Sequence, residues 1–276
     1  MKRACVIGWP IAHSRSPLIH GHWLRTYGID GSYVKQPVRP DDIVSFLGNL
    51  GDHGFVGCNV TLPYKQTAYA VAAEKHPAAR AVAAANTLWL DGGRLVADNT
   101  DGIGFMNHLW ASVPAFEPTR CVAAVLGAGG AARAIVHAFL EAGVSEVRVF
   151  NRTRERADAI ATHFGPRVQA FDWEQRVGRS ADVGILVNAT SLGMTGSAPL
   201  DMDVASLANA CIVADIVYAP LTTPLLAAAR RRGLIAVDGL GMLLHQAVPG
   251  FERWFGVRPQ VTDELRDLIV ADLGAA

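Results

Sequence analysis

The 276-residue sequence has little cysteine, no excess of charge of either sign and no long apolar run. Its four cysteines lie far apart and form no CxxC pair, which argues against a zinc ribbon or a redox dithiol. We expect them to be small buried apolar residues in a reducing cytosol. Lys+Arg and Asp+Glu each total 25, so the formal net charge is zero. No overall electrostatic field therefore draws the chain to nucleic acid or to an anionic membrane.

Targeting, membrane and metal signals are also missing. The N-terminus is basic but lacks the apolar run of a signal peptide, and no stretch of about 18 apolar residues predicts a membrane span. The nine histidines contain no HExxH motif, and His20 and His22, two apart on a presumed helix, face different sides. We therefore expect a soluble, cytoplasmic protein without a metal or a membrane partner.

Short apolar runs alternate with helical stretches along most of the chain. The predicted strands are Cys5–Ile7, Tyr33–Pro37, Gly57–Val60, Thr87–Leu90, Val122–Leu126, Val147–Phe150, Ile185–Val187, Ile212–Ile216 and Ile235–Val237. This alternation is typical of βα units and mostly parallel sheets, whose strands are apolar on both faces. The length allows two modest domains. The sequence therefore predicts an α/β protein of two domains.

One helix has clear signals at both ends. Ser16 followed by Pro17 predicts an N-cap with proline at the first helical position, and Gly28 is placed to end the helix. Chain crossings between the domains are expected near residues 101–105, ahead of a proline-broken stretch, and near residues 240–246.

A glycine-rich turn follows the predicted strand Val122–Leu126 and precedes a predicted helix. Its sequence is Gly127-Ala128-Gly129-Gly130-Ala131-Ala132. In a dinucleotide site, Gly127 would permit the tight turn, Gly129 would let a pyrophosphate approach the backbone, and Ala132 would let the helix lie close to the strand. The phosphates would meet the N–H groups of the helix N-terminus. The alternative is an ordinary glycine turn.

The next predicted strand, Val147–Phe150, ends in an arginine cluster. The sequence there is Asn151-Arg152-Thr153-Arg154-Glu155-Arg156. NAD enzymes usually carry a carboxylate at this point for the ribose hydroxyls, whereas arginine favours the 2′-phosphate of NADP. Arg152 is the first candidate and Arg156 the second, although Arg154 or Arg156 could belong to a solvated helix face.

Several further motifs occur in a fixed order. They are His13-Ser14-Arg15-Ser16-Pro17, Asn59-Val60-Thr61-Leu62-Pro63-Tyr64-Lys65, Ala85-Asn86-Thr87-Leu88, Asp98-Asn99-Thr100-Asp101-Gly102, the 127–133 loop, Asn188-Ala189-Thr190-Ser191-Leu192-Gly193-Met194, Asp215-Ile216-Val217-Tyr218-Ala219-Pro220, Thr223-Pro224-Leu225-Leu226 and the segment from Asp238-Gly239 to His245-Gln246-Ala247. With these motifs the chain resembles the shikimate dehydrogenase family along essentially its whole length, and specifically the NADP-dependent biosynthetic members.

The resemblance implies a reversible NADPH-dependent reduction of 3-dehydroshikimate to shikimate. It also implies a substrate-binding and catalytic domain formed by residues 1–104 and 245–276, with a Rossmann-type NADP-binding domain, residues 105–244, inserted between them. The residues expected around the substrate ring are Ser14, Ser16, Asn59, Thr61, Asn86, Asp101, Tyr218 and Gln246, of which the two serines and Tyr218 would bind the carboxylate. The residues expected at the cofactor are Gly127, Ala128, Gly129, Gly130, Ala131, Asn151, Arg152, Thr153, Arg156, Thr190, Ser191, Ile216 and Gly239.

Lys65 and Asp101 are the catalytic pair that the resemblance implies. Lys65 falls in the first turn of a predicted helix, where a cation opposes the macrodipole and the neutral amine is favoured. Asp101 alone would be interpreted as a turn or helix-capping residue, and its charge favours the ammonium form of Lys65 instead. Sequence alone leaves the balance of these two effects open.

Two other functions remain alternatives, and small departures from the family pattern bear on the first of them. Trp9, Gly21, Ala83 and Ala85 differ from the usual residues and affect the expected shape of the cleft, and so the choice between shikimate and quinate. One alternative is therefore a quinate/shikimate dehydrogenase that uses NAD, and another is a catalytically silent NADPH-binding regulator. We expect a monomer or a homodimer.

Overall fold

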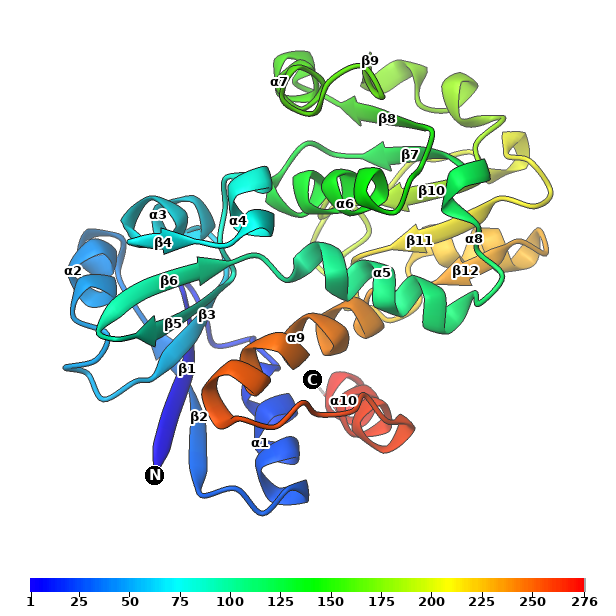
Figure 1. Ribbon diagram of the computed structural model, residues 1–276. Coiled ribbons are helices and arrows are strands. Elements are labelled where there is room, and N and C mark those ends of the chain that lie inside the picture. The colour runs from blue at the N-terminus through cyan, green and yellow to red at the C-terminus, as the bar shows by residue number, and fades with distance from the viewer. Residues whose placement is uncertain (276) are drawn as a thin grey trace. The chain divides into compact units, whose positions relative to one another are not determined.

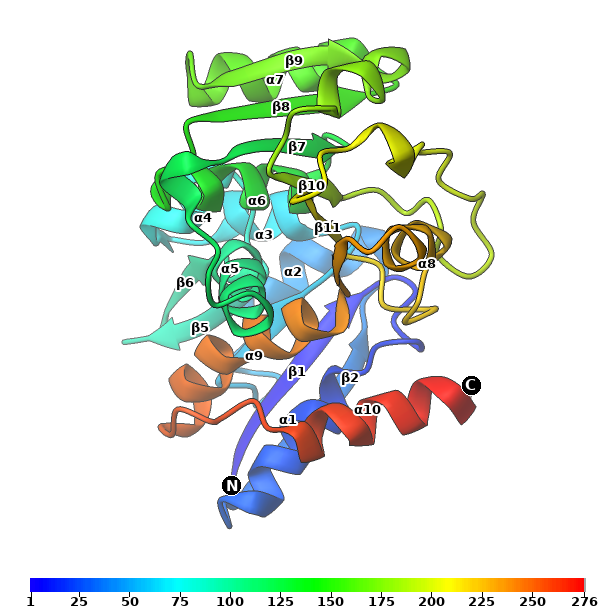
Figure 2. The same ribbon diagram turned by 90° about the vertical axis from the view of Figure 1, so that its right-hand side faces the viewer.

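The protein is described by a computed structural model that covers residues 1–275 and divides the chain into two compact units. The first unit contains residues 1–104 and 244–274, and the second contains residues 105–243. Figures 1 and 2 show the elements of both units, each built from helices around a β-sheet. The predicted α/β class with two domains is confirmed.

The first unit contains a mixed sheet of six strands in the order β2-β1-β3-β5-β6-β4. Its strands are β1 (Lys2–Gly8), β2 (Gly31–Pro37), β3 (Gly57–Val60), β4 (Glu74–Lys75), β5 (Thr87–Asp91) and β6 (Arg94–Asp98). Strand β1 pairs in parallel with β2 and β3, whereas β5 is antiparallel to both β3 and β6. The β5–β6 hairpin turns at Gly92 and Gly93, both at positive φ, as a two-residue turn of this hand requires.

The register of this sheet brings three motifs to one edge. Asn59 at the end of β3 pairs with Thr87 at the start of β5, which in turn pairs with Asp98 at the end of β6. Because β5 runs against both neighbours, its first residue lies beside their last residues. The segments 60–65, 85–87 and 98–101, distant in sequence, therefore meet at this edge.

Helices cover both faces of the first sheet. They are α1 (Ser16–Thr26), α2 (Ile43–Gly48), α3 (Lys65–Val71), α4 (Pro77–Val82), α9 (Leu240–Phe255) and α10 (Asp263–Ala275), together with the start of α5 (Asp101–Ser112). Tyr33 and Val34 on β2 show the alternation: Tyr33 stacks on His20 of α1, whereas Val34 packs against the core that α2 and α3 cover. Figure 2 shows α10 beside α1 on the side of the sheet that carries α9.

The close packing of α9 explains a glycine in β3. The indole N–H of Trp254 donates to the carbonyl of Leu88 at 2.9 Å. A Cβ at Gly57 would lie 2.0 Å from this indole nitrogen, so no side chain fits there. The glycine lets a helix from the C-terminal part of the chain lie directly on the N-terminal sheet.

The second unit contains a six-stranded parallel sheet in the order β12-β11-β10-β7-β8-β9. Its strands are β7 (Val122–Leu126), β8 (Glu146–Asn151), β9 (Val168–Asp172), β10 (Ile185–Asn188), β11 (Ile212–Asp215) and β12 (Ile235–Val237). The chain runs outward from β7 to β9 and then returns to β10 on the other side of β7. This reversal places a topological switch point between β7 and β10, where open α/β sheets bind ligands beyond the carboxyl ends of their strands.

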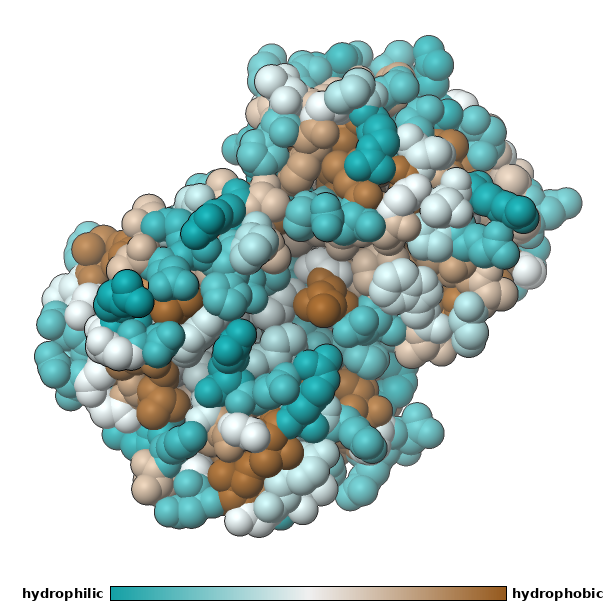
Figure 3. Space-filling model, viewed as in Figure 1, coloured by the Kyte–Doolittle hydropathy of each residue, from teal (hydrophilic) through white to brown (hydrophobic). Residues whose placement is uncertain are grey.

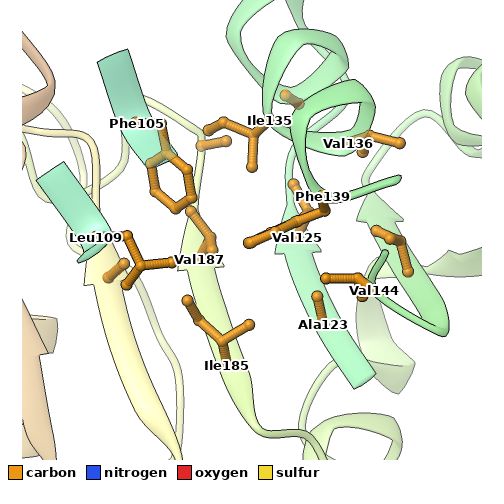
Figure 4. Packing of buried hydrophobic residues seen from close by; sticks show 14 of the residues in the cluster. Phe105, Leu109, Ala123, Val125, Ile135, Val136, Phe139, Val144, Ile185 and Val187 are labelled. Atoms are coloured by element: carbon orange, nitrogen blue, oxygen red, sulfur yellow. The ribbon is translucent and has the colours of Figure 1, made fainter. Parts of the chain in front are cut away.

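Helices also pack on both faces of the second sheet. Besides the C-terminal part of α5, they are α6 (Gly130–Glu141), α7 (Arg154–Phe164) and α8 (Pro224–Arg231). Figure 4 shows Phe105 of α5 and Phe139 of α6 among Val125 and Val187 of the sheet, and α7 joins the same cluster. The opposite face is covered by α8 and by the segment 200–211. Both faces are buried, which explains the continuous apolar runs of these strands.

Short 3₁₀ helices complete the secondary structure. They lie at Pro40–Asp42, Pro118–Arg120, Trp173–Gln175, Gly178–Ser180 and Val204–Ser206.

Some local expectations were wrong. Strands β4, β6 and β9 were not predicted: β4 has only two residues, β6 has three apolar residues between two charged ones, and β9 carries polar side chains. The strand expected over Ile212–Ile216 ends at Asp215. Ser16 is not an N-cap: α1 begins at Ser16, and the Ser16 N–H donates to Ser14 Oγ at 3.3 Å, so Ser14 makes the local bond expected of Ser16.

The polar surface and the buried cysteines are consistent with two apolar cores. Figure 3 shows polar side chains over most of the face in view, with apolar residues in small separate groups. Among residues 1–275, no helix combines the length and apolar character needed to cross a bilayer. All four cysteines are buried and free, as expected. Burial raises the pKa of the Cys121 and Cys211 thiols to about 11, so neither is an activated nucleophile.

Candidate active site

A shielded ion pair lies at the edge of the first sheet where the three motifs meet. Lys65 is the first residue of α3, and its Nζ donates to Oδ2 of Asp101, the first residue of α5. The Lys65 side chain is 20% exposed and that of Asp101 8% exposed. The pair is thus largely removed from water, while the amine remains accessible enough to meet a ligand.

Asn86 orients Asp101 and connects it to neighbouring groups. Asn86 Nδ2 lies 2.8 Å from Asp101 Oδ1, 3.0 Å from Thr100 Oγ1 and 3.3 Å from Gln246 Oε1. Its Oδ1 accepts the Thr100 N–H at 2.8 Å. The Asp101 N–H donates to Asn99 Oδ1 at 3.1 Å. Two amide hydrogens therefore have three acceptors, and the longest contact, to Gln246, is the one that a ligand oxygen can replace most easily.

Asn59 is buried and already well bonded. Its Nδ2 donates to the Asn86 carbonyl at 3.1 Å and to Thr87 Oγ1 at 3.2 Å, and its Oδ1 accepts the Tyr33 hydroxyl at 2.6 Å. A continuous polar chain thus runs from Tyr33 through Asn59 to Asn86. Asn59 has one lone pair left for a ligand and no spare donor.

The serine loop before α1 is anchored from the C-terminal helix. Arg15 Nε lies 2.5 Å from Asp272 Oδ2 of α10, and Arg15 Nη1 donates to the His13 carbonyl at 2.9 Å. These contacts direct the guanidinium to α10 and fix the backbone between Ser14 and Ser16. Ser14 is half-buried, so its hydroxyl can reach a ligand.

His20 supports this loop from the core. It is fully buried, stacks on Tyr33 with ring centroids 3.9 Å apart, and lies edge-on to Trp23 at 5.6 Å. Burial lowers the pKa of His20 to about 3, and contact with Asn59 opposes this only in part. The imidazole is therefore neutral in the folded protein and cannot act as a cationic ligand for a carboxylate.

Because the unfolded chain protonates His20 at a higher pH than the folded chain does, we predict that this residue makes the fold acid-sensitive. Between pH 6.5 and about 3 the unfolded state holds the extra proton. Stability should fall with decreasing pH by up to about 1.4 kcal/mol per pH unit from this group. Urea unfolding of the parental protein and of His20→Phe across this range should show a shallower pH dependence in the variant. His53→Phe, at an exposed site, is the control, and parallel curves for all three proteins would contradict the prediction.

The glycine loop of the second unit has the shape that a pyrophosphate needs. Gly127 has φ +107°, and its N–H donates to the Phe150 carbonyl at 2.7 Å. A Cβ built on Gly129 or Gly130 would meet no atom within 4 Å, so the space in front of the α6 N-terminus is open. Ala132 is fully buried against the sheet, as expected. Free N–H groups, a positive helix end and open space suit a dinucleotide phosphate.

The arginines after β8 differ in their partners. Arg154 Nε lies 2.9 Å from Asp158 Oδ1, and its Nη1 lies 3.3 Å from Asp172 Oδ2. The side chains of Arg152 and Arg156 are exposed and make no ion pair or hydrogen bond with any residue in the described range 1–275. Two guanidinium groups thus remain available for a phosphate, and these are the two that the sequence favoured.

The remaining cofactor candidates lie on turns after β10, β11 and β12. A Cβ at Gly127 would lie 3.0 Å from Thr190 Cγ2, so the Thr190 turn borders the glycine loop. A Cβ at Gly239 would lie 2.3 Å from the Ile216 carbonyl oxygen, so these two backbones also touch. Ser191 is exposed beside Thr190. These contacts cluster around the switch point of the second sheet.

The structure therefore groups the candidates by unit. Lys65, Asp101, Asn86 and Gln246 form one bonded group in the first unit, and Asn59 joins it through the Asn86 carbonyl. Tyr218 belongs to the second unit with the cofactor candidates.

Sequence reasoning missed several supporting residues. Thr87, Thr100 and Asp215 lie inside the motifs already noted, and their polar character before or after buried strands was a usable signal. Tyr33 had no such signal, because an aromatic residue in a predicted strand normally indicates only core packing. No group of three or more His, Cys, Asp or Glu side chains in the described residues is arranged to hold a metal.

Comparison with known proteins finds relatives that match this chain along its whole length. Residues 6–88 match the shikimate dehydrogenase substrate binding domain, residues 115–198 match the shikimate/quinate 5-dehydrogenase model, and residues 239–263 match the shikimate 5′-dehydrogenase C-terminal domain. The NADP(+)-dependent shikimate dehydrogenase of Azorhizobium caulinodans is 53% identical, over 100% of this chain and 98% of its own length.

Solved structures show the same fold. Shikimate 5-dehydrogenase from Thermus thermophilus, in complex with NADP(H) and shikimate, has a TM-score of 0.87 and 34% identity, with 99% of this chain and 100% of the other covered. Quinate dehydrogenase from Corynebacterium glutamicum, in complex with NAD, has a TM-score of 0.90 and 29% identity, with 98% and 99% covered. The fold alone thus does not separate the shikimate and quinate enzymes.

Proposed function

Since the chain belongs to the shikimate dehydrogenase family, we propose that it catalyses the reversible, NADPH-dependent reduction of 3-dehydroshikimate to shikimate. The observation that carries this proposal is the Lys65–Asp101 pair, present in a partly shielded, hydrogen-bonded setting in a chain similar to NADP-dependent enzymes over its full length. A catalytically silent NADPH-binding regulator would not require a pair that transfers a proton.

The residues of the first unit would manage the proton in this reaction. Bound NADPH supplies the hydride that the ring ketone accepts. Lys65, held by Asp101, would donate a proton to the developing alkoxide, and in the reverse direction the neutral amine would accept the hydroxyl proton. Asn86 would hold Asp101 and bond a ring hydroxyl in place of its long contact to Gln246. Ser14 and Ser16 would bind the carboxylate.

The second unit would hold the cofactor. The pyrophosphate would lie at Gly129 and Gly130, and Arg152 with Arg156 would bind the 2′-phosphate. Asn151 and Thr153 would contact the adenosine side, while Thr190, Ser191, Ile216 and Gly239 would border the nicotinamide. The proposed domain bounds, residues 1–104 with 245–276 and residues 105–244, are supported by the two compact units of the fold. We propose that the protein acts in the cytoplasm.

A comparison of four substrate and cofactor pairs tests the function directly. Purified protein is given shikimate or quinate together with NADP or NAD, and the nicotinamide absorbance is followed. We expect the shikimate–NADP pair to have the highest kcat/KM. Faster oxidation of quinate with NAD would identify the chain as a quinate/shikimate dehydrogenase, and no turnover with intact NADPH binding would identify a regulator.

We predict that Ser14→Ala weakens shikimate binding by roughly 1–3 kcal/mol, because a carboxylate that loses a buried hydrogen-bond donor is left short of a partner. The KM for shikimate should rise accordingly, while the affinity for NADPH should barely change. Because Ser14 Oγ also accepts the Ser16 N–H at the start of α1, the melting temperature of Ser14→Ala should be compared with that of the parental protein. An unchanged KM for shikimate in Ser14→Ala would move the carboxylate site elsewhere.

A further inference from the structure

A buried carboxyl group connects the turns that carry the cofactor candidates of the second unit. Asn188 and Asp215 are the last residues of the neighbouring strands β10 and β11 and pair in register. They are 0% and 2% exposed. Asn188 pairs with Leu126 of β7 at the switch point, and Asp215 lies one strand further away. Neither is assigned a contact with substrate or cofactor in the proposed function.

Asp215 accepts three hydrogen bonds from three different segments. Its Oδ1 accepts Asn188 Nδ2 at 2.9 Å and the Val217 N–H at 3.0 Å, and its Oδ2 accepts the Thr223 hydroxyl at 2.7 Å. Thr223 is the N-cap of α8 and accepts the Leu226 N–H. One carboxylate thus ties β10, the segment after β11 and the start of α8 together.

Asn188 extends the same network into the turn after β10. Its Oδ1 accepts the Thr190 N–H at 3.1 Å and the Thr190 hydroxyl at 2.7 Å. Its Nδ2 also donates to the Leu192 carbonyl at 3.0 Å, and the Leu192 N–H returns a bond to Thr190 Oγ1 at 3.0 Å. The shape of residues 188–192 is therefore set by this amide, which Asp215 holds.

The two segments that the network shapes lie against the cofactor loops. Thr190 borders Gly127, and the Ile216 backbone borders Gly239. A further bond, from the Thr195 N–H to the Ala219 carbonyl at 2.9 Å, joins the residues that follow the two segments in the chain. A shift of the carboxylate would therefore reach both sides of the cofactor site.

From this arrangement we propose that Asp215 is a positioning residue for NADP: its ionised carboxylate holds the 188–192 turn and the 216–218 segment in the shape that binds the cofactor. The inference rests on the proposed assignment of Thr190, Ser191 and Ile216 to the cofactor. Asp215 itself touches neither cofactor nor substrate.

The ionisation of Asp215 gives this role a pH dependence. Burial raises its pKa to about 6, against the opposing effect of the donors from Thr223, Val217 and Asn188, and no charged group contributes among the described residues. Oδ1 already has two N–H donors, so a proton would sit on Oδ2 and convert Thr223 Oγ1 from donor to acceptor. A charge-assisted bond at the α8 N-cap becomes a weaker neutral one. Cofactor binding should therefore weaken as the pH falls through about 6.

Asp215→Asn tests the proposal because the amide mimics the protonated acid. We expect its Kd for NADPH, measured by fluorescence titration without substrate, to be roughly 5- to 10-fold above the parental value at pH 8 and to approach the parental value at pH 5, in line with one weakened hydrogen bond. The 2′-phosphate also titrates near pH 6, but it does so for both proteins and cancels in the ratio. The variant should melt at the same or a higher temperature at pH 8, since it no longer buries a charge.

Two further comparisons separate positioning from general stability. Asp203→Asn makes the same change at an exposed aspartate that accepts the Ala205 N–H in the same unit. Its Kd for NADPH should equal the parental Kd at both pH values. Thr223→Val removes the hydroxyl while keeping the shape and should raise the Kd several-fold, whereas Thr223→Ser should restore it.

Equal NADPH affinity of Asp215→Asn, Thr223→Val and the parental protein at both pH values would overturn this inference alone. If the ratio of the Asp215→Asn Kd to the parental Kd were the same at pH 5 and pH 8, the inference would also be overturned, because the effect would then not depend on the ionisation of Asp215. Failure of the parental protein to bind NADPH would overturn both the inference and the proposed cofactor site. Failure to oxidise shikimate despite normal NADPH binding would overturn only the proposed function.

Discussion

Lys65→Ala should fold, bind NADPH normally and lose kcat by roughly the 10²–10⁴ typical of general acid–base catalysis. The physical reason is that Nζ of Lys65 is the proton donor that Asp101 orients, and the variant leaves the ketone oxygen without one. Lys65→Arg is the matched variant, because it keeps the cation but cannot release its proton at accessible pH. We expect it to be almost as slow as Lys65→Ala.

Asp101→Asn should also lower kcat, because it removes the charge that pairs with Lys65 and its single amide oxygen can accept from only one of the donors Lys65 and Asn86. The double variant Lys65→Ala/Asp101→Asn should lose less than the product of the two single losses, since the residues act as one unit. The measurements are pH–rate profiles for the parental enzyme and the four variants, with NADPH fluorescence titration as the control for folding. Near-parental kcat in Lys65→Ala across the pH range would contradict the acid–base assignment even if the family assignment stands.

Much of the fold was predictable where a local pattern is sufficient. The apolar run at Val122–Leu126 became β7 with the expected bounds, because a parallel strand buried on both faces leaves a continuous apolar signature. The strand expected over Gly57–Val60 also has the expected bounds. The 127–132 loop was also predictable from a local pattern, because a strand-turn-helix unit requires the positive φ of Gly127 and the burial of Ala132. Strand β9 was not, because an edge strand with polar residues depends on its neighbour more than on its own sequence.

The site was less predictable where a side chain acts through distant partners. Lys65 and Asp101 were named from motifs, and the structure brings them into contact. Ser16 was assigned a helix-capping role, but Ser14 Oγ accepts the Ser16 N–H. Asn59 was named from a motif, but it accepts a bond from Tyr33 on a separate strand, which no local pattern could indicate. Asp215 was noted only as part of a motif. Its importance follows from three donors that arrive from β10, from the next segment and from α8, and such convergence exists only in the folded chain.

The second large effect expected is on the choice of cofactor. The parental protein should oxidise shikimate with NADP far more efficiently than with NAD, because Arg152 and Arg156 have no partner in the described part of the chain and are available to a 2′-phosphate. Hydrogen bonds from a charged donor contribute roughly 1.5–3 kcal/mol each, so Arg152→Ala should raise the KM for NADP by about 10-fold or more. The KM for NAD, which lacks the phosphate, should hardly change.

The double variant Arg152→Ala/Arg156→Ala should reduce the preference for NADP further, and it should remove part of the salt dependence of NADP binding, because both arginines are exposed and their attraction to the phosphate is screened. Arg154→Ala is the matched control: this arginine lies between them in sequence but is paired with Asp158 and Asp172, so its loss should leave the ratio of kcat/KM for NADP and NAD near the parental value. Steady-state kinetics with both cofactors at two salt concentrations measure all three variants. Equal losses with NADP and NAD in Arg152→Ala would show that this arginine does not bind the phosphate. If only Arg154→Ala changed the ratio of kcat/KM for NADP and NAD strongly, the phosphate-binding role would belong to Arg154.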